Sequence, residues 1–387
     1  MLKKFYVRNY KNFKDTLVVD FSKVGGYQFN TECITNNTIG KSIIYGRNAT
    51  GKTNLGRALM DIKFVISNSP GLRDQEYILN ADSEETSAVF HYEFLFNNVE
   101  IMYEYSRKLN FNFGKEMLII DGKKAFELDY DQKKFIACDL NVLGIESLHL
   151  DRYMEVLEHD VENVENEENI QFSFARFILN NSPLMPDSPL RMMENFVRGM
   201  SFIGVNSQVS TTQFQTKLLS AFTRYIDAAD NLMDFQHFLN IMGVDCELNI
   251  KELPDGNREL YFNHDKQLPF WKTASSGTRA LTNLYCRFIF MNSKVPFVFL
   301  DEFDAFFHYE MSENIVNYFK KYCPESQVVM TTHNTNLMTN HIVRPDCVFI
   351  LSTSGQLTAL CDATERELRE GHNLEKLYIG GEFEKYE

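Results

Sequence analysis

A glycine-rich segment near the N-terminus has the residues and spacing of a phosphate-binding loop. It reads Gly46-Arg47-Asn48-Ala49-Thr50-Gly51-Lys52-Thr53, which is G-x-x-x-x-G-K-T. Glycines allow backbone N–H groups to close around phosphate oxygens, and the N-terminus of a following helix adds the positive end of its dipole. The apolar residues 42–45 predict a strand before the loop, and residues 54–60 predict a helix after it. We therefore expect this loop, together with Asn54, to bind a nucleotide.

Four side chains, two of them in this loop, are predicted to act on the bound phosphates, their cation or the attacking water. Lys52 is expected to reach the outer phosphates and to assist catalysis, and the Thr53 hydroxyl is expected to ligate Mg²⁺. The apolar run 295–300, typical of a strand buried on both faces, ends in Asp301 and Glu302. Ligands of open α/β sheets bind at the carboxyl ends of strands. Asp301 is therefore predicted to hold Mg²⁺, directly or through water, and Glu302 to orient or deprotonate the attacking water.

Two other segments are candidates for contact with the same phosphates. His333 follows a second buried run at 328–332 and is expected to hydrogen-bond a phosphate or the attacking water; a purely structural histidine is the alternative. Ser275, Ser276 and Gly277 precede an amphipathic helix, whose apolar positions are 281, 284, 285, 288 and 289. Such a helix start presents N–H groups and a hydroxyl to an anion, although an ordinary helix cap has the same composition.

The elements that position these residues change in type along the chain. Alternating apolar and polar residues up to about position 135 predict strands, and residues 91–105 predict a hairpin with a turn at 97–98. Helical patterns such as 176–179 and 216–238 dominate the middle, and strands return at 246–250 and 259–262. The sequence has no heptad repeat sustained over several turns, so a long coiled coil is not expected. We predict an α/β protein with lobes at 1–139 and 241–387 around a helical insertion at 140–240.

Composition narrows the functional classes. A net charge of −14 over 387 residues argues against a broad nucleic-acid-coating surface, although Lys3, Lys4, Arg8, Lys11 and Lys14 form a candidate local patch. The acidic stretch 151–168 is a solvated segment or a docking surface for a basic partner. The charged start and the lack of an 18-residue apolar run predict no leader and no membrane span. The scattered seven cysteines indicate reduced thiols, so a cytoplasmic location is expected.

In their order along the chain, these motifs resemble those of ABC-type ATPases of the branch that contains SMC, Rad50 and RecF proteins. The loop at 46–53 corresponds to Walker A, 275–278 to the signature, 297–302 to Walker B, 304–308 to the D-loop and His333 to the switch histidine. More narrowly, the chain resembles the RecF-like AAA15/AAA21 proteins of bacterial phage-defence and abortive-infection systems. That likeness rests on segments 8–13, 301–304, 332–335 and 373–383.

This resemblance implies a two-lobed ABC-ATPase head with a mixed sheet, ATP as the nucleotide and Mg²⁺ as its cation. It also implies a homodimer or higher homo-oligomer, in which Ser276 and Gly277 of one subunit face the loop of another. The activity implied is ATP hydrolysis in an anti-phage defence complex, with dimerisation controlling a separate nuclease or toxin effector. The sequence departs from the pattern in its Ser-Ser-Gly-Thr signature and in His308 at the D-loop end, and Gln208 is only a weak candidate for the Q-loop glutamine.

Three other functions fit parts of the pattern. A RecF-like DNA-repair clamp would use the same ATPase residues and would bind DNA in an ATP-dependent manner. A transporter energiser fits poorly, because about 220 residues separate the loop from the signature. An ATP-gated scaffold with negligible turnover would share every binding residue with the ATPase. The sequence leaves the effector, the trigger, the stoichiometry and the host open.

Overall fold

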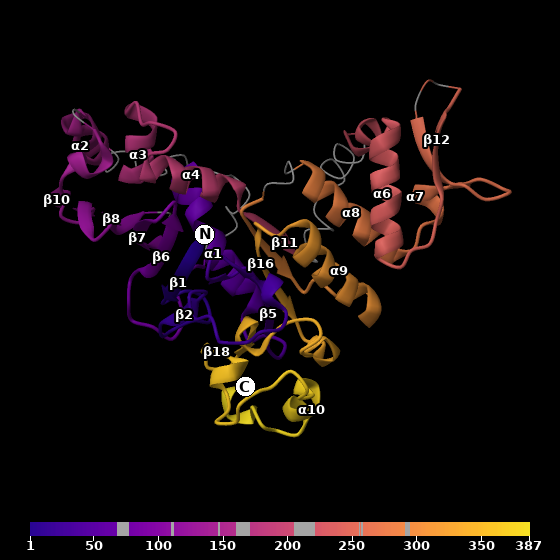
Figure 1. Cartoon of the computed structure of the whole chain (residues 1–387). Coiled ribbons are helices and arrows are strands. Elements are labelled where there is room, and N and C mark those ends of the chain that lie inside the picture. The colour runs from indigo at the N-terminus through magenta and orange to yellow at the C-terminus, as the bar shows by residue number, and fades with distance from the viewer. Residues whose placement is uncertain are drawn as a thin grey trace.

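A computed structural model describes residues 1–67, 77–109, 112–145, 148–159, 171–204, 221–254, 256, 258–290 and 295–387. Two large sheets face each other across a central helix, and a smaller lobe projects from the second sheet (Figure 1). This arrangement confirms the predicted α/β class. Among the described residues, no helix is both long and apolar enough to cross a bilayer.

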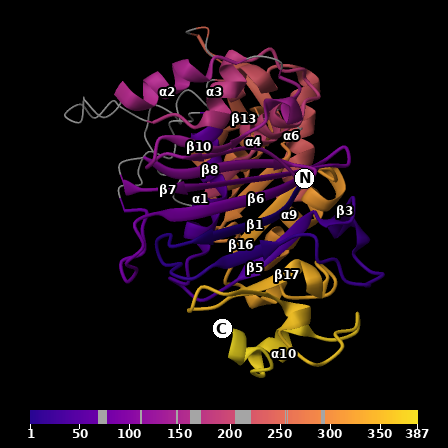
Figure 2. The same cartoon turned by 90° about the vertical axis from the view of Figure 1, so that its left-hand side faces the viewer.

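The first sheet is antiparallel and has seven strands, which Figure 2 shows lengthwise. The predicted hairpin is present as two paired strands, and its turn residues Asn97 and Asn98 have positive φ angles of 50° and 66°. Asparagine tolerates this backbone region better than most residues do, which explains the tight turn. In spatial order the strands are β10 (Lys134–Cys138), β9 (Lys123–Asp129), β8 (Phe113–Ile120), β7 (Val99–Arg107), β6 (Ala88–Phe96), β1 (Leu2–Arg8) and β2 (Leu17–Asp20).

The second sheet carries the phosphate-binding loop. Its strands are all parallel except β18, which runs antiparallel to β17. Every residue of β5, β15, β16 and β17 is buried, which agrees with the buried strands predicted at 295–300 and 328–332. The spatial order is β11 (Ser201–Gly204), β15 (Phe297–Asp301), β16 (Gln327–Thr332), β5 (Lys41–Tyr45), β17 (Val348–Leu351) and β18 (Leu357–Ala359).

Helix α1 (Lys52–Ser67) lies between the two sheets and contacts both. On one side Gly56 packs so closely that an added Cβ would lie 2.4 Å from the Phe299 ring and 2.6 Å from the Phe202 ring. On the other side Tyr105 donates a 2.9 Å hydrogen bond to Asp61, which also pairs with Arg107 of β7. The helix that begins at the phosphate-binding loop is therefore fixed to the antiparallel sheet.

The remaining helices lie beside the two sheets, in the projecting lobe or near the C-terminus. Helices α2 (Leu150–His159), α3 (Phe174–Asn181) and α4 (Pro189–Gly199) lie beside the antiparallel sheet, and α9 (Tyr309–Tyr322) lies beside the parallel one (Figure 1). The projecting lobe combines α6 (Ala229–Ile241), α7 (Phe270–Thr273) and α8 (Ser276–Phe290) with the small sheet β12 (Leu248–Glu252), β13 (Arg258–Phe262) and β14 (Leu268–Pro269). A final helix, α10 (Leu374–Ile379), lies near the C-terminus.

The predicted helical middle of the chain contains α2, α3, α4 and α6, but it also supplies strand β11. This short Ser-Phe-Ile-Gly strand pairs in parallel with β15, so the span contributes to the central sheet as well as to its cover. A strand of four residues gives too short a pattern to separate from a helix end. The boundaries 1–139, 140–240 and 241–387 stay predictions, and part of the predicted 216–238 helix lies outside the described residues.

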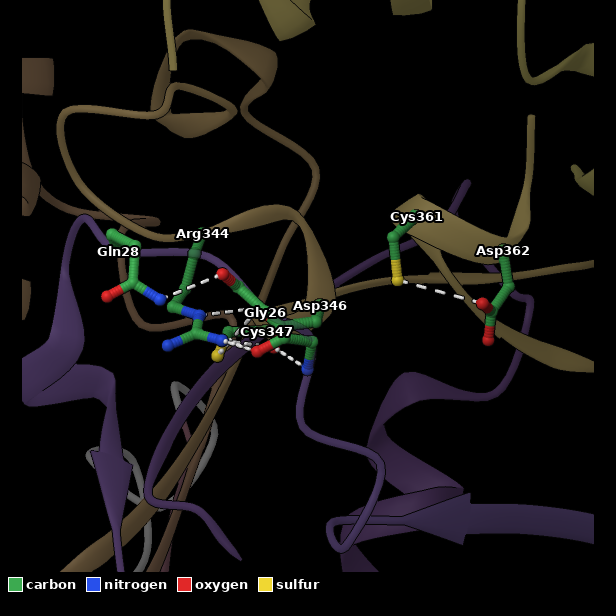
Figure 3. Close-up of polar contacts among 8 residues, drawn as sticks. Gly26, Gln28, Arg344, Asp346, Cys347, Cys361 and Asp362 are labelled. Atoms are coloured by element: carbon green, nitrogen blue, oxygen red, sulfur yellow. Dashed lines mark hydrogen bonds and ion pairs between the residues drawn. The ribbon is translucent and has the colours of Figure 1, made fainter. Parts of the chain in front are cut away.

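Two polar connections join segments that are distant in the sequence. The carboxamide of buried Gln327, on β16, bonds the backbone N–H of Leu2 at 3.1 Å, the carbonyl of Leu2 at 3.0 Å and that of Ile39 at 3.2 Å. Figure 3 shows the second, where buried Arg344 and Asp346 pair side by side before β17. Arg344 donates to the Gly25 carbonyl, and Asp346 accepts from the Gly25 N–H, each at 2.6 Å. Both connections tie the start of the chain to its last third.

Candidate functional site

The phosphate-binding loop lies between β5, which ends at Tyr45, and α1, which begins at Lys52, as the motif predicts. Gly51 has a φ of +105°, a region that residues with side chains rarely adopt. Ala49 also has a positive φ, of 66°. Within the loop, Thr50 donates a 3.0 Å hydrogen bond to the Arg47 carbonyl. The tips of the loop, Arg47, Asn48 and Ala49, are exposed.

Lys52 is almost completely buried at the base of this loop, with 4% of its surface exposed. Its ammonium group donates to the carbonyl oxygens of Gly46 at 2.7 Å and Arg47 at 3.0 Å. Burial lowers the pKa of Lys52, while the negative charges of Glu302 and Asp301 act in the opposite direction. These carboxylates help to keep a charged ammonium in a poorly solvated position, where it is available for an anion.

The hydroxyl of Thr53 connects the loop to the end of β15. It donates a 2.7 Å hydrogen bond to Oδ2 of Asp301, and the hydroxyl of Thr331 bonds the other carboxylate oxygen, Oδ1, at 2.9 Å. Burial raises the pKa of Asp301, and the two hydroxyl donors oppose that effect. The structure thus brings Thr53, at the end of the loop, together with Asp301, which lies 248 residues further along the sequence.

Glu302 is the next residue and has a φ of +46°, in the left-handed region. Such a conformation costs roughly 1–3 kcal/mol for a residue other than glycine, and strain of this kind is concentrated at functional sites. The bend leaves the Glu302 side chain only partly buried. Asp304, two residues on, is buried and accepts a 2.7 Å hydrogen bond from Thr332, while its Oδ1 has no partner within the described part of the chain.

His333 directly follows β16, so it lies at the same sheet edge as Asp301, and its side chain is exposed. Its neighbour Asn334 is fixed by a 2.9 Å hydrogen bond from its backbone N–H to the Thr332 hydroxyl. The structure therefore places the histidine at the sheet edge where β15 also ends. Its predicted contact with phosphate or water stays a prediction.

The signature segment begins helix α8, on the other side of the parallel sheet from α1 (Figure 1). Ser275 caps this helix: its hydroxyl accepts from the Thr278 N–H at 3.1 Å. Ser275 and Ser276 are exposed and Gly277 partly so. Further along α8, Ala280, Asn283, Leu284 and Arg287 line a cavity of about 30 Å³ together with residues of β11, of β15 and of the turn after β15, Asp301 and Glu302 among them. The hydrogen bonds of Ser275 stay within its own turn.

Three residues at the site had no predicted role. Asn12, in the turn after β1, donates a 2.9 Å hydrogen bond to the Thr50 carbonyl and accepts one of 2.8 Å from Asn54. The sequence predicts Thr331 only as part of a buried strand. Glu387 pairs with exposed Arg47 of the loop at 2.6 Å. Each contact spans at least 29 residues, so no local spacing indicates it; a hydroxyl residue in a wholly buried strand is the available signal.

The residues present fit a magnesium–nucleotide. Three carboxylates, Asp301, Glu302 and Asp304, face one ammonium group, Lys52, so the sheet edge has an excess of negative charge that a divalent cation would balance. The Thr53 hydroxyl donates its proton to Asp301, which leaves its oxygen lone pairs free for a cation. Within the described residues no group of three His, Cys, Asp or Glu side chains is arranged to hold a metal by itself. A cation here would therefore need phosphate oxygens or water as further ligands.

Comparisons with known proteins match the chain to one protein family and to several solved structures. Residues 41–339 match the model of a protein family described as "AAA domain, putative AbiEii toxin, Type IV TA system". No curated protein matches the chain by sequence. Solved structures of similar shape include the SMC head domain from Thermotoga maritima, at 15% identity and a TM-score of 0.47, covering 92% of this chain and 98% of that one. Another is the Smc head domain from Pyrococcus furiosus bound to the C-terminal domain of ScpA, at 14% identity and a TM-score of 0.47, covering 93% and 96%.

Proposed function

Because the chain belongs to the family of AbiEii-type AAA domains, we propose that it binds ATP with Mg²⁺ and hydrolyses it to ADP and phosphate. The observation that carries this proposal is the hydrogen bond between Thr53 and Asp301. It brings the end of the phosphate-binding loop to the carboxylates of β15. Two motifs that have no reason to be neighbours in a structural role are thereby joined at one sheet edge.

Each side chain has a definite part in this proposal. Backbone N–H groups of residues 46–53 and the Lys52 ammonium bind and orient the phosphates, while Thr53 and Asp301 hold the cation, Asp301 directly or through water. When bound, the cation neutralises negative charge on the phosphates. Glu302 orients a water molecule and accepts its proton, and His333 donates a hydrogen bond at the same edge. Positioning and charge neutralisation supply most of the catalysis that phosphoryl transfer requires.

Hydrolysis is proposed to need two subunits. Ser275 and Ser276 are exposed at the N-terminus of α8, and Phe306, beside them in the D-loop region, has 45% of its surface exposed. A second copy that placed this face over the loop of the first would complete each site with hydroxyl and N–H donors. ATP would then act as part of the interface, so that nucleotide state controls assembly.

The downstream role proposed is control of a separate effector in a phage-defence complex. This part rests on the family and on the resemblance of the motifs, and it assigns the effector, a nuclease or a toxin, to another chain. The DNA-repair clamp remains the alternative, but two of its candidate cations already have partners. Arg8 pairs with Glu85 at 3.3 Å, and Lys3 bonds the Thr38 hydroxyl at 3.0 Å.

The first test compares the purified chain with Lys52→Ala and with Lys321→Ala, which removes an exposed lysine from α9. Binding of a fluorescent ATP analogue and release of phosphate are measured with and without Mg²⁺. We expect Lys52→Ala to lose most of its affinity, and Lys321→Ala to match the unaltered chain. Normal turnover by Lys52→Ala would remove the basis of the ATPase proposal.

A second test addresses the partner. The chain is expressed with its neighbouring genes, purified in Mg²⁺–ATP and analysed by native mass spectrometry. A dimer, or a multiple of dimers, that carries ATP and a second polypeptide is the expected result. Dimers that instead carry nucleic acid, with binding that weakens steeply as salt is added, would favour the repair clamp.

A further inference from the structure

Thr331 occupies the last but one position of β16, the strand that lies between the Walker B strand β15 and the loop-bearing strand β5. It pairs with Ile44 of β5 across the sheet, and its side chain is completely buried. A valine or isoleucine would fill such a buried strand position equally well. The hydroxyl therefore calls for an explanation other than packing.

That hydroxyl forms two hydrogen bonds, and the donor of each can be identified. The backbone N–H of Glu302 can only donate, and it does so to Thr331 Oγ1 at 2.8 Å. The hydroxyl proton is then free for Asp301, whose Oδ1 lies 2.9 Å away. One side chain thus holds the carboxylate predicted to serve the cation and the backbone of the residue predicted to serve the water.

The second of these bonds coincides with the strained residue. Glu302 has its φ of +46° where the chain leaves β15, and the N–H bonded to Thr331 belongs to that same residue. The next N–H, of Phe303, donates to the Thr331 carbonyl at 3.2 Å. Thr331 therefore contacts the bend through both its side chain and its backbone, and a left-handed conformation persists only where its surroundings over-determine it.

We propose that Thr331 is a positioning residue for this site: its hydroxyl sets the orientation of Asp301 and holds Glu302 in its bent conformation. The expected effect on catalysis rests on the proposed function. The effect on the conformation of Asp301 and Glu302 concerns the nucleotide-free chain alone. The neighbouring Thr332 bonds Asp304 and the N–H of Asn334 instead. The two hydroxyls of β16 thereby serve different segments of the same edge.

The test uses three variants of nearly equal size. Thr331→Val keeps the shape and removes both hydrogen bonds, whereas Thr331→Ser keeps the hydroxyl. Thr282→Val is the matched control, since Thr282 is also fully buried and its hydroxyl donates to the Thr278 carbonyl of its own helix, at 2.8 Å. Should Thr331→Val not accumulate as folded protein, Thr331→Ala, which also lacks the hydroxyl and introduces no bulk, carries the same expectation.

Two measurements are made. In the nucleotide-free chain, hydrogen–deuterium exchange of the Glu302 and Phe303 amides should be faster in Thr331→Val than in the unaltered chain, Thr331→Ser or Thr282→Val. With nucleotide, Thr331→Val should need roughly 10- to 100-fold more Mg²⁺ for half-maximal analogue binding, as outer-shell partners of metal ligands commonly do. Its kcat should fall within the same range, with little change in KM.

Unchanged exchange together with an unchanged Mg²⁺ requirement in Thr331→Val would overturn the inference. So would Thr331→Ser behaving like Thr331→Val, because the hydroxyl would then not be the group that matters. If the unaltered chain bound no nucleotide, the proposed function would fail while the exchange measurement still decided whether Thr331 holds the bend. The two failures are therefore distinguishable.

Discussion

Asn12 donates a hydrogen bond of 2.9 Å to the carbonyl oxygen of Thr50, and so the turn after β1 rests directly on the phosphate-binding loop. The contact is close because the neighbouring loop residue is a glycine: a Cβ on Gly51 would lie 2.2 Å from the Asn12 amide nitrogen. Asn54 completes the arrangement by donating to the Asn12 oxygen at 2.8 Å. The antiparallel sheet therefore takes part in shaping the loop that belongs to the parallel one.

Asn12→Ala should weaken ATP binding by about three- to tenfold, because one or two hydrogen bonds of about 0.5–1.5 kcal/mol each no longer order the loop. The effect should appear in Kd and KM, with a smaller change in kcat. Titration with a fluorescent ATP analogue measures it, and Asn195→Ala, which truncates an exposed residue of α4, is the control. Equal affinity of both variants would show that the contact does not shape the binding site.

Ser276→Arg should abolish most ATP turnover while leaving nucleotide affinity within about twofold of normal. Ser276 is exposed at the start of α8. An arginine side chain there is expected to obstruct the approach of a second subunit and to leave the phosphate-binding loop of the same subunit unaffected. Phosphate release and analogue binding are compared with those of Thr273→Arg, which places the same charge at another exposed position nearby. A parallel loss of binding and turnover would contradict a site shared between subunits.

Glu302→Gln should bind Mg²⁺–ATP and hydrolyse it roughly 10²- to 10⁴-fold more slowly, the range in which a positioned acid or base contributes. Slow hydrolysis should prolong the ATP-bound dimer. Sedimentation in Mg²⁺–ATP is therefore expected to show dimers for the variant and mainly monomers in ADP. Normal hydrolysis by the variant would assign the general base to another residue.

The buried pair of Asp61 and Arg107 gives a prediction about stability. Both side chains are at most 2% exposed, and they join α1 to β7. Asp61→Ala should lower the free energy of unfolding by roughly 3–5 kcal/mol, since it leaves a guanidinium buried without its carboxylate, and that group does not deprotonate. Arg107→Met leaves a carboxyl group, which becomes neutral when it binds a proton.

The two variants should therefore differ in their dependence on pH. Burial already raises the pKa of Asp61 above its ordinary value of 3.8 with Arg107 in place. When the folded state raises the pKa of a carboxyl group, stability falls as the pH rises through that pKa. The loss of unfolding free energy caused by Arg107→Met should therefore become smaller as the pH is lowered from 8 to 5. Denaturant unfolding at both pH values measures this. A deficit that grows towards pH 5 would show that Asp61 is not the group responsible.

The sequence predicted those parts of the site that depend on local spacing. The loop at 46–53 and the carboxylates at 301–302 lie on the elements expected of them, because a strand, a turn and a helix follow one another within a few residues. The α/β class followed from the same patterns. The separate roles of Lys52, Glu302 and His333 stay predictions that the variants above address.

Contacts between distant segments could not be predicted in this way. Asn12 reaches the site from the antiparallel sheet, Thr331 through strand pairing within the parallel sheet, and Glu387 from the C-terminal segment. A single sequence carries no record of these distant contacts. Strand β11 was hidden for a different reason, since four residues are too few for a period to emerge. Gln208 lies outside the described residues, so the Q-loop position stays open.

The strand order has a consequence for how the protein is made. β5, which leads into the phosphate-binding loop, is synthesised early, yet both of its neighbours, β16 and β17, come from residues 327–351. While the ribosome adds the intervening residues, the wholly buried β5 has no partner strand and its apolar surface is exposed to other chains. A product truncated before residue 327 would lack both neighbours of β5 as well as His333, and would present an unpaired strand, which makes it a substrate for chaperones and proteases.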